Sequence, residues 1–583
     1  MIPRLTRWIT YILVSGAFLY LFMNYNPFVN YDGTLTSGIW RNAISWKDMP
    51  IKYPVESMIP MPTAEFEHIP MVQYTFAVEN SKEASKQEER RNAVKKVFQK
   101  CWASYKKHAW MKDELAPLSG GYKNTFGGWA ATLVDSLDTL WIMGMKEEFY
   151  EAMKAVDQID FSRTVMEEIN VFETTIRYLG GFLSAYDLSG ETALLDKAIE
   201  VGEMVYVAFD TPNRMPITRW DIHSAAKGYR VPAPEHILVA EIGSLTMEFT
   251  RLSQITGDSK WYDASLRIMK IFDKQQAHTK LPGMWPVTVN AEKADFTQDT
   301  WYTLSAMADS LYEYLPKMYA LIGGVDNMYK KMYEESIDTA LNNLVFRPMV
   351  PGTPDILISG NVRANSPVSV KLEPENQHLG CYTGGMLALA AKIFGRAGDL
   401  FAANKLTDGC IYSYHAFPLG IMPEISHMLP CPSKDKCEWD EKKWRTAVLE
   451  AEGREVNEAN MKDFNPRLPP GFVKIPDTRY ILRPEAIESI FILYRVSGRT
   501  DLLDSAWDMF NAINNATQTE LANAALMDVT SVNGPQRKQN SMESFWTAET
   551  LKYFFLIFSE VDMISLDDWV FNTEAHPFKR PGV

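Results

Sequence analysis

The sequence has few of the residues that build common metal sites. Its 583 residues include 5 Cys and 9 His, and neither type forms the paired CxxC motifs or the His clusters of a zinc centre. Long alternations of apolar and polar residues, which predict strands, are scarce. Acidic residues outnumber basic ones by 73 to 59, which gives a net charge of -14. This charge argues against nucleic acid as a partner, because neutralising phosphates needs clustered Lys and Arg.

The sequence does contain a large apolar fraction. Hydrophobic residues make up 46% and charged residues 23%, which is typical of a folded globular chain rather than a disordered one. Aromatic residues reach 12%, with 16 Trp. Sugar-binding clefts use such side chains, but so do large cores, and aromatic content alone therefore does not choose a function.

The N-terminus differs in composition from the rest of the chain. Arg4 and Arg7 precede an uncharged apolar run from Ile9 to Met23, shorter than the roughly 20 residues of a usual spanning helix but extended by the residues up to Phe28. A cleaved signal peptide is the alternative, but no A-x-A cleavage site follows the run. We expect a cytosolic tail at 1–8 and a signal anchor at 9–28, with the positive side in the cytosol.

This topology predicts a single-pass type II protein of the secretory-pathway membrane, in the Golgi or the endoplasmic reticulum. Residues 29–85 are punctuated by Pro and weakly periodic, and we interpret them as a lumenal stem. Residues 86–583 then form one catalytic domain. Disulfides are permitted in this compartment, and Cys381 with Cys410 and Cys431 with Cys437 are the pairs we expect. Cys101 would remain free.

One pattern recurs along the body: a helix ends at a small-residue turn and another helix follows. Gly190, Gly257, Gly398 and Gly498 mark such turns, each where a helix would end in the left-handed conformation. Repeated helical hairpins without a β framework predict an all-α fold, either a solenoid or a closed toroid.

The stretch "YILRPEAIES" at 480–489 places two carboxylates at the start of an otherwise apolar helix. Pro484 suits the first helical position. Glu485 and Glu488 then share one face of the opening turn, because residues three apart are neighbours on a helix. Carboxylates that complement the helix dipole are the alternative explanation.

Other acids also lie in apolar surroundings. Glu173 has Arg177 four residues on, so an i,i+4 ion pair competes with a functional role, and Asp309 and Glu313 are four apart among apolar and aromatic neighbours, where capping and a solvated face compete. The remaining cases are Glu241, Glu424, Glu549 and the chain-terminal group Thr573, Glu574 and His576.

So many carboxylates in apolar segments are an excess, because buried acids are costly unless they are paired or used. A shared cleft of carboxylates would raise some pKa values, so that one acid donates a proton while another stays ionised. Glycoside hydrolysis requires this arrangement. A ring of acids could instead bind divalent cations, so the pattern alone does not choose between the two.

Six segments together resemble the signature blocks of the class I α-mannosidases, glycoside hydrolase family 47. They occur in the family's order over about residues 90 to 580, and they read "GGWAATLVDSLDTLWIMG", "VFETTIRYLGGFLSAYDLSG", "ADSLYEYLPK", "LRPEAIES", "FWTAETLKY" and "FNTEAHP". The resemblance implies an (α/α)7 barrel, a toroid of helical hairpins. It also implies an inverting exo-α-1,2-mannosidase that trims high-mannose N-glycans as a monomer.

The resemblance also implies roles for single residues. Glu173 would be the acid that protonates the leaving oxygen, Glu485 the base that activates water, and Asp309 and Glu424 the other essential acids. Thr573 would coordinate calcium, a hard cation that prefers oxygen ligands. The residues expected to hold its waters or the sugar are Glu241, Glu488, Glu549 and Glu574. Cys381 and Cys410 match the family's disulfide pair.

Two departures from the family pattern bear on specificity. Met307 stands where the endoplasmic-reticulum type has an Arg, two residues before Asp309, so strict removal of a single mannose is not expected. The segment 428–445, with its own Cys pair, has no counterpart in the blocks above. A lectin-like barrel that selects misfolded glycoproteins is the alternative function, and the presence of every matched acid disfavours it.

Overall fold

Helices dominate the computed structural model, which describes residues 44–77, 80–464, 468–531 and 536–582. Contacts divide the chain into a unit Met1–Ile44 and a unit Ser45–Val583, and the second unit is the subject below. The expected tail at 1–8 and anchor at 9–28 lie outside the described residues. In the part that is described, no helix is both long enough and apolar enough to cross a membrane.

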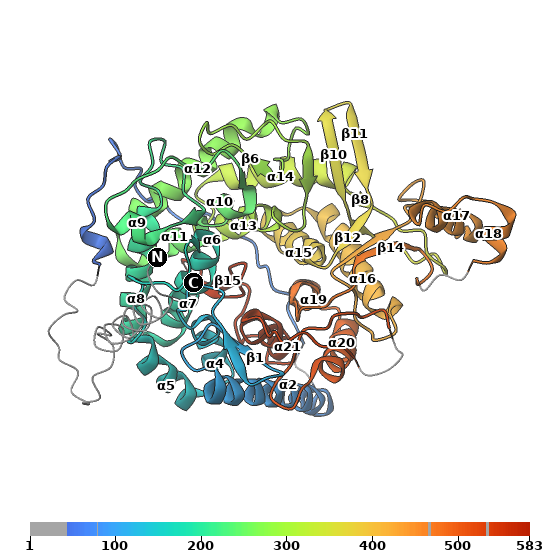
Figure 1. Cartoon of the computed structure of the whole chain (residues 1–583), viewed down its shortest axis with the longest axis horizontal. Coiled ribbons are helices and arrows are strands. Elements are labelled where there is room, and N and C mark those ends of the chain that lie inside the picture. The colour runs from blue at the N-terminus through green and yellow to red at the C-terminus, as the bar shows by residue number, and fades with distance from the viewer. Residues whose placement is uncertain (1–43, 78–79, 465–467, 532–535, 583) are drawn as a thin grey trace, which may run out of the picture. The chain divides into compact units, whose positions relative to one another are not determined.

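Seven helices that are buried along most of their length form a ring, which short α4 closes against η5, the turn that leads into α21 (Figure 1). In chain order they are α4 (Leu137–Ile142), α7 (Gly180–Ser189), α11 (Thr246–Thr256), α13 (Asp309–Leu321), α15 (Tyr382–Phe394), α19 (Glu485–Ser497) and α21 (Leu551–Ile557).

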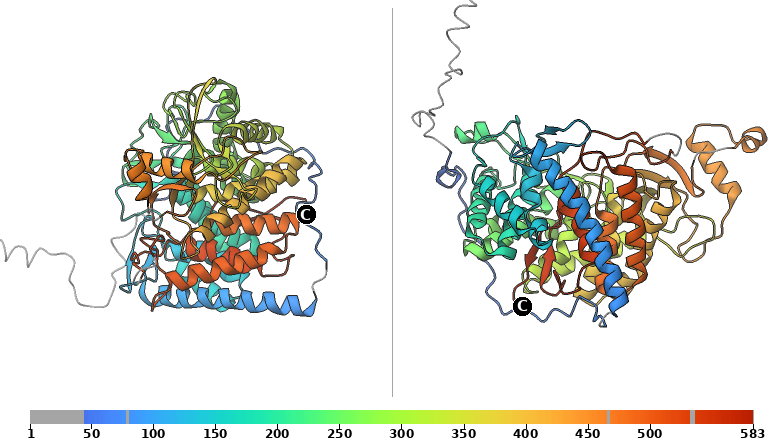
Figure 2. Two further views of the ribbon diagram at one scale, coloured as in Figure 1. Left: turned by 90° about the vertical axis from the view of Figure 1, so that its right-hand side faces the viewer. Right: turned by 90° about the horizontal axis from the view of Figure 1, so that it is seen from below.

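A second helix packs on the outside of each ring helix. These partners are α5 (Lys146–Val156), α8 (Thr192–Val207), α12 (Lys260–Gln275), α14 (Asn327–Asn343), α16 (Ala397–Ala416), α20 (Asp501–Thr517) and α2 (Ser81–His108). Six pairs are consecutive hairpins, whereas α2 packs against α21 and so joins the two ends of the domain (Figure 2). The all-α class and the (α/α)7 barrel predicted from the sequence are confirmed.

Glycines end several of these helices as predicted. Gly190, Gly257 and Gly498 adopt φ of 75°, 75° and 74° after α7, α11 and α19, the left-handed conformation that costs glycine least. The prediction for Gly398 was wrong. Gly395 ends α15 with φ 69°, and Gly398 lies inside α16.

Short strands and helices connect the hairpins and carry much of the pocket. The short helices are α3 (Ala131–Asp135), α6 (Val171–Glu173), α9 (Ile222–Ala226) and α10 (Val239–Gly243), with η1 (Trp46–Asp48), η2 (Thr174–Leu179), η3 (Gln276–His278), η4 (Leu379–Cys381) and η5 (Trp546–Thr550). The two-stranded sheets are β1 (Glu114–Ala116) with β2 (Gly121–Lys123), β3 (Ile169–Asn170) with β4 (Arg219–Trp220), β5 (Ile237–Leu238) with β6 (Thr288–Val289), β8 (Val345–Phe346) with β9 (Ile358–Ser359) and β15 (Trp569–Phe571) with β16 (Pro577–Lys579).

Two sheets have three antiparallel strands. In the first, β10 (Asn361–Ser366) lies between β7 (Trp301–Thr303) and β11 (Ser369–Glu373). In the second, β13 (Ile425–Met428) lies between β12 (Glu375–Gln377) and β14 (Phe472–Asp477). The turn of the β15–β16 hairpin, residues 572–576, carries Thr573 and Glu574 to the pocket.

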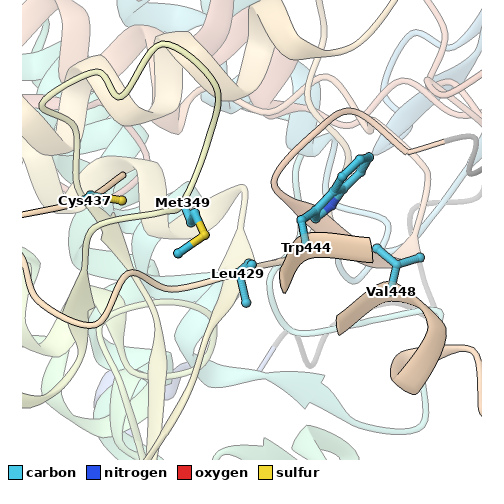
Figure 3. Close-up of a cluster of buried hydrophobic side chains, with 5 residues drawn as sticks. All are labelled: Met349, Leu429, Cys437, Trp444 and Val448. Carbon is cyan, nitrogen blue, oxygen red and sulfur yellow. The ribbon is translucent and has the colours of Figure 1, made fainter. Parts of the chain in front are cut away.

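The segment 428–445 begins an appendage between β13 and β14, which continues through α17 (Glu441–Ala451) and α18 (Glu458–Lys462) and projects from the barrel (Figure 1). A small core anchors it, formed by Met349, Leu429, Cys437, Trp444 and Val448 (Figure 3). The expected disulfides Cys381–Cys410 and Cys431–Cys437 both form, and Cys101 is free and buried.

Residues 45–77 form an extended strap that is hydrogen-bonded to the barrel. Backbone N–H groups of Tyr53, Ile59 and Val72 donate to the carboxylates of Asp210, Asp263 and Asp567. We expected the whole of residues 29–85 to be a stem, but this part of it belongs to the compact unit that begins at Ser45. Its pairing is mostly backbone to side chain, which leaves no periodic pattern in the sequence.

Candidate active site

A cavity of about 310 Å³ opens among the ends of the ring helices and the β15–β16 turn. Eight of the nine residues predicted for the site line it: Glu173, Glu241, Asp309, Glu485, Glu488, Glu549, Thr573 and Glu574. They come from six separate parts of the chain, so the fold brings together what the sequence separates. Glu424 is not among the lining residues.

Glu485, the first residue of α19, is held in its ionised form. The Nδ1–H of His378 donates to its carboxylate at 2.8 Å, and the Arg483 guanidinium lies 3.5 Å away. Burial alone would raise the pKa of Glu485, but Arg483 and His378 outweigh burial and hold the pKa below its ordinary value. Pro484 directly precedes the helix and does not occupy its first position, yet Glu485 and Glu488 share the opening turn as predicted.

His378 is a site residue that the sequence did not reveal. Its ring is fully buried, and its Nε2 lies 2.7 Å from the hydroxyl of Tyr414 while its Nδ1 faces Glu485. The surrounding "ENQHLGC" has no motif that would indicate this contact. His378 therefore orients the carboxylate and favours its charged form.

We expect His378→Phe to shift the acidic limb of the pH–rate profile to higher pH. Loss of the hydrogen bond raises the pKa of Glu485, and a base must be ionised to act, so activity falls earlier as pH decreases. A hydrogen bond to a charged group is worth about 1.5–3 kcal/mol, so kcat/KM on the acidic side should fall about tenfold or more. Steady-state rates between pH 4 and 8 measure this shift.

Tyr414→Phe is the matched control for this prediction, since it removes only the hydroxyl that His378 accepts from. Tyr414→Phe should shift the acidic limb of the pH–rate profile to higher pH by a smaller amount than His378→Phe does. Superimposable profiles for His378→Phe and the unaltered chain would contradict the role given to His378.

Glu424 lies behind Arg483 rather than in the cavity. Its carboxylate accepts from the Arg483 Nε at 2.5 Å and from the Ile481 backbone N–H at 3.2 Å, while Arg483 itself lines the cavity. Glu424 thus fixes the side chain that faces Glu485. A Pro-Glu pair at the start of a strand does not indicate this depth, which is why the sequence placed Glu424 beside the other acids.

Asp309 begins α13 on another wall of the cavity. Burial raises the pKa of Asp309 to about 7, and the charges of Glu313 and Glu485 act in the same direction. Glu313, one turn along, lines the cavity and pairs with buried Lys317. The cavity therefore contains a carboxyl group that can hold a proton near neutral pH, Asp309, together with one that is held ionised, Glu485.

Glu173 ends α6, whose first turn is capped by Asn170. The Asn170 side chain accepts from the backbone N–H groups of Phe172 and Glu173. Arg177 donates to Glu173 at 3.0 Å, and the same guanidinium also pairs with Glu574. The predicted i,i+4 ion pair is therefore present, and it lies in the cavity wall.

Two buried acids, Glu488 and Glu549, line the cavity together with Thr573, and this group is named the cavity floor. Burial raises the pKa of Glu488 and of Glu549 well above the ordinary value, and the two charges also repel each other. Tyr553 donates to Glu488 at 2.8 Å. Thr573 lies beside them in the cavity lining.

The backbone is unusual where these residues are placed. Glu173 is followed by the π-helical turn η2, and Glu549 lies within a second π-helical turn, η5; such turns often occur at functional sites. Met307, Leu482 and Ala575 have φ of 73°, 72° and 59°, a conformation that L-residues adopt only when their surroundings impose it. Each is within three residues of a cavity-lining acid.

The cavity has an excess of negative charge that fits a hard cation. Eight carboxyl groups and three Arg residues line it, and two of the buried acids on its floor repel each other. Carboxylate, hydroxyl and carbonyl oxygens suit calcium, and Thr573 with Glu488 and Glu549 provides them. In the described ranges, no three or more His, Cys, Asp or Glu side chains form a ready-made metal cage.

Comparison with known proteins agrees with this geometry. The model of glycosyl hydrolase family 47 matches residues 97–580. An endoplasmic reticulum mannosyl-oligosaccharide 1,2-alpha-mannosidase of Mus musculus is 32% identical over 92% of this chain and 74% of its own. A probable mannosyl-oligosaccharide alpha-1,2-mannosidase 1B of Aspergillus clavatus is 31% identical over 88% of this chain and 99% of its own. The solved alpha-1,2-mannosidase from Trichoderma reesei superposes with a TM-score of 0.72 at 29% identity, covering 85% of this chain and 99% of that one.

Proposed function

Because this chain belongs to glycosyl hydrolase family 47 and is a glycoside hydrolase, we propose that it is an inverting exo-α-1,2-mannosidase that trims terminal mannose from high-mannose N-glycans. One observation carries the proposal. Eight of the nine predicted site residues line a single cavity, in which Glu485 is held ionised while burial raises the pKa of Asp309 to about 7. Paired carboxyl groups with separated pKa values are what glycoside hydrolysis needs.

Each residue then has a role that its contacts support. Glu485, oriented by His378 and Arg483, takes the proton of the water that attacks the anomeric carbon. Glu173, held in place by Arg177, protonates the leaving oxygen. Glu424 acts through Arg483 as a positioning residue. Burial raises the pKa of Asp309 to about 7, so that it can hold a further proton in the cavity.

Calcium is the cofactor in this proposal. Thr573 would hold it, with Glu488, Glu549, Glu574 and Glu241 binding its waters or the sugar hydroxyls. When bound, calcium supplies positive charge and a fixed centre to which two sugar hydroxyls can bind. The protein's contribution is the negatively charged floor that makes such an ion favourable there.

The proposed cellular setting is the membrane of the secretory pathway, in the Golgi or the endoplasmic reticulum, and both the sequence and the relatives support it. The relatives include endoplasmic reticulum mannosidases, and the apolar run at 9–28 suits a membrane anchor of the secretory pathway. The lectin-like alternative is not favoured, because the acids of the matched blocks are present and eight of the nine predicted site residues line one cavity.

The proposal is tested by incubating the full chain with a labelled high-mannose N-glycan, with and without a calcium chelator. We expect free mannose to appear first as the β-anomer, as an inverting reaction requires, and release to stop when calcium is removed. Proton NMR of the anomeric signals and product sizes over time measure both. Release of α-mannose would contradict inversion, and full activity in the chelator would contradict the cofactor.

A further inference from the structure

The strap at residues 45–77 lies outside the family-matched residues 97–580 and packs on segments that adjoin the cavity lining. Its first turn is η1, and Trp46 of that turn is buried against the barrel. The Trp46 ring packs on the ring of Trp220, with 5.6 Å between centroids. Its indole N–H donates to the carbonyl of Phe161 at 3.2 Å.

The first of these contacts leads to Glu173 through a small sheet. Trp220 lies in β4 and is paired with Ile169 of β3, and the neighbouring pair is Arg219 with Asn170. Asn170 caps the turn that ends at Glu173, and the Val171 N–H donates to the Thr218 carbonyl. A shift of β4 would therefore move the cap of the turn that holds Glu173.

The second contact leads to the partner of Glu173. The Phe161 ring packs edge-on against Tyr178 of η2, with 5.7 Å between centroids. Tyr178 directly follows Arg177, which donates to Glu173 at 3.0 Å. Trp46 is thus linked to both elements that hold this carboxylate, to the capped turn through Trp220 and to the π-helical turn through Phe161.

A buried carboxylate clamps the strap just after Trp46. Asp210 accepts the backbone N–H groups of Lys52 and Tyr53 at 2.9 and 2.8 Å and pairs with Arg230 at 2.6 Å. Arg230 and Arg214 in turn donate to the carbonyls of Pro50 and Tyr53. Charge-assisted hydrogen bonds of this kind are the stronger ones, so they hold the start of the strap in one register.

We propose that Trp46 is a positioning residue of the active site, which holds the β3–β4 wall and the η2 turn so that Glu173 faces the leaving oxygen. This rests on the proposed function, in which Glu173 is the acid. A catalytic group that is displaced by about 1 Å can lose about a hundredfold in rate. The start of the strap therefore acts on the active site through Trp46 and is not only a connection to the N-terminus.

The test compares two substrates in the full chain. α-1,2-Mannobiose needs a proton on its leaving oxygen, whereas α-mannosyl fluoride does not, because fluoride departs with the bonding electrons and requires no acid. Glu173→Gln is the reference variant and should lose far more activity on mannobiose than on the fluoride. Trp46→Ala should show the same imbalance, with kcat on mannobiose about tenfold to a hundredfold lower and a much smaller loss on the fluoride.

Two further variants keep the test decisive. Asp567→Asn loosens the strap at its far end, where Asp567 accepts from Val72, and should lower the midpoint of thermal unfolding without changing the ratio of the two rates. Trp46→Phe keeps a ring on Trp220 and should fold even where Trp46→Ala does not, with an intermediate ratio because the bond to Phe161 is lost.

The outcomes separate the two proposals. Equal losses on both substrates for the Trp46 variants, or rates like those of the unaltered chain, would overturn the positioning role. An imbalance for Asp567→Asn as large as that for Trp46→Ala would also overturn it, because any loosening of the strap would then suffice. If the unaltered chain releases no mannose, or Glu173→Gln affects both substrates equally, the proposed function or its acid fails instead.

Discussion

Glu485→Gln should reduce mannose release by about 10²–10⁴-fold, the contribution of a general base. The amide oxygen can still accept the hydrogen bond that His378 donates to the carboxylate in the unaltered chain, so the fold and the cavity should persist. What the amide cannot do is take a proton from water. We therefore expect kcat to fall while the dissociation constant of a mannose-like inhibitor changes little.

The measurement is single-turnover release of labelled mannose, with inhibitor binding followed by calorimetry. Glu560→Gln is a matched control, since it makes the same chemical change in an ion pair with Arg91 on the outside of the barrel. Its rate should equal that of the unaltered chain. Release by Glu485→Gln within about tenfold of the unaltered rate would move the base to another carboxylate of the cavity.

The individual helices of the ring were predictable from the sequence because the signals that define a helix are local. Apolar spacing defines each buried face, and a glycine such as Gly498 ends its helix in the left-handed conformation. Closure of the ring is a long-range property, and it entered the prediction only through the resemblance. The misplaced cap at Gly398 shows the limit, because two glycines three residues apart give the same local signal.

Motifs predicted which residues belong to the candidate site. They did not predict how far each side chain lies from the cavity. Motif matches placed Glu173 and Glu485 in one cavity, but nothing in the sequence shows that Glu424 lies behind Arg483. His378 has no pattern at all around it. The π-helical turns were missed because one extra residue in a turn does not disturb a 3.6-residue period enough to be visible.

The strap escaped prediction for a related reason. Its N–H groups bond to Asp carboxylates far away in the sequence, and backbone donors are the same in every residue. A proline-rich, weakly periodic segment has the sequence pattern of a linker, whether or not it packs on the surface of the domain. Large apolar side chains in this segment do not separate the two cases, because Trp46 is buried while Phe66 and Tyr74 are exposed.

The second large effect is expected at a buried charge network beneath the cavity floor. Lys552 lies 2.8 Å from Asp138 and donates to the carbonyl of Ala575 at 2.7 Å. His576 lies 2.8 Å from the same carboxylate, and all three side chains are fully buried. Lys552 and His576 outweigh the effect of burial and lower the pKa of Asp138, while Asp138 raises that of His576. This network holds the turn that carries Thr573.

Lys552→Met should lower the free energy of unfolding by about 3–5 kcal/mol, the cost of leaving a buried charge without its partner. The pH dependence has a definite sign. The pKa of His576 is raised in the folded state, so its ion pair with Asp138 is fully present below the unfolded pKa of about 6.5 and is lost as pH rises through the folded pKa. The penalty should therefore be smaller at pH 6 than at pH 9.

Urea unfolding of the unaltered chain, Lys552→Met and the double variant Asp138→Asn/Lys552→Met at both pH values measures this. The double variant removes the stranded charge, so it should be more stable than Lys552→Met alone. A double variant that is less stable than the single one would show that Asp138 is not stranded when Lys552 is lost.

The network holds the 572–576 turn by its backbone at Ala575, so Lys552→Met should also weaken calcium binding. A loss of stability with unchanged calcium affinity would show that the network supports the core alone.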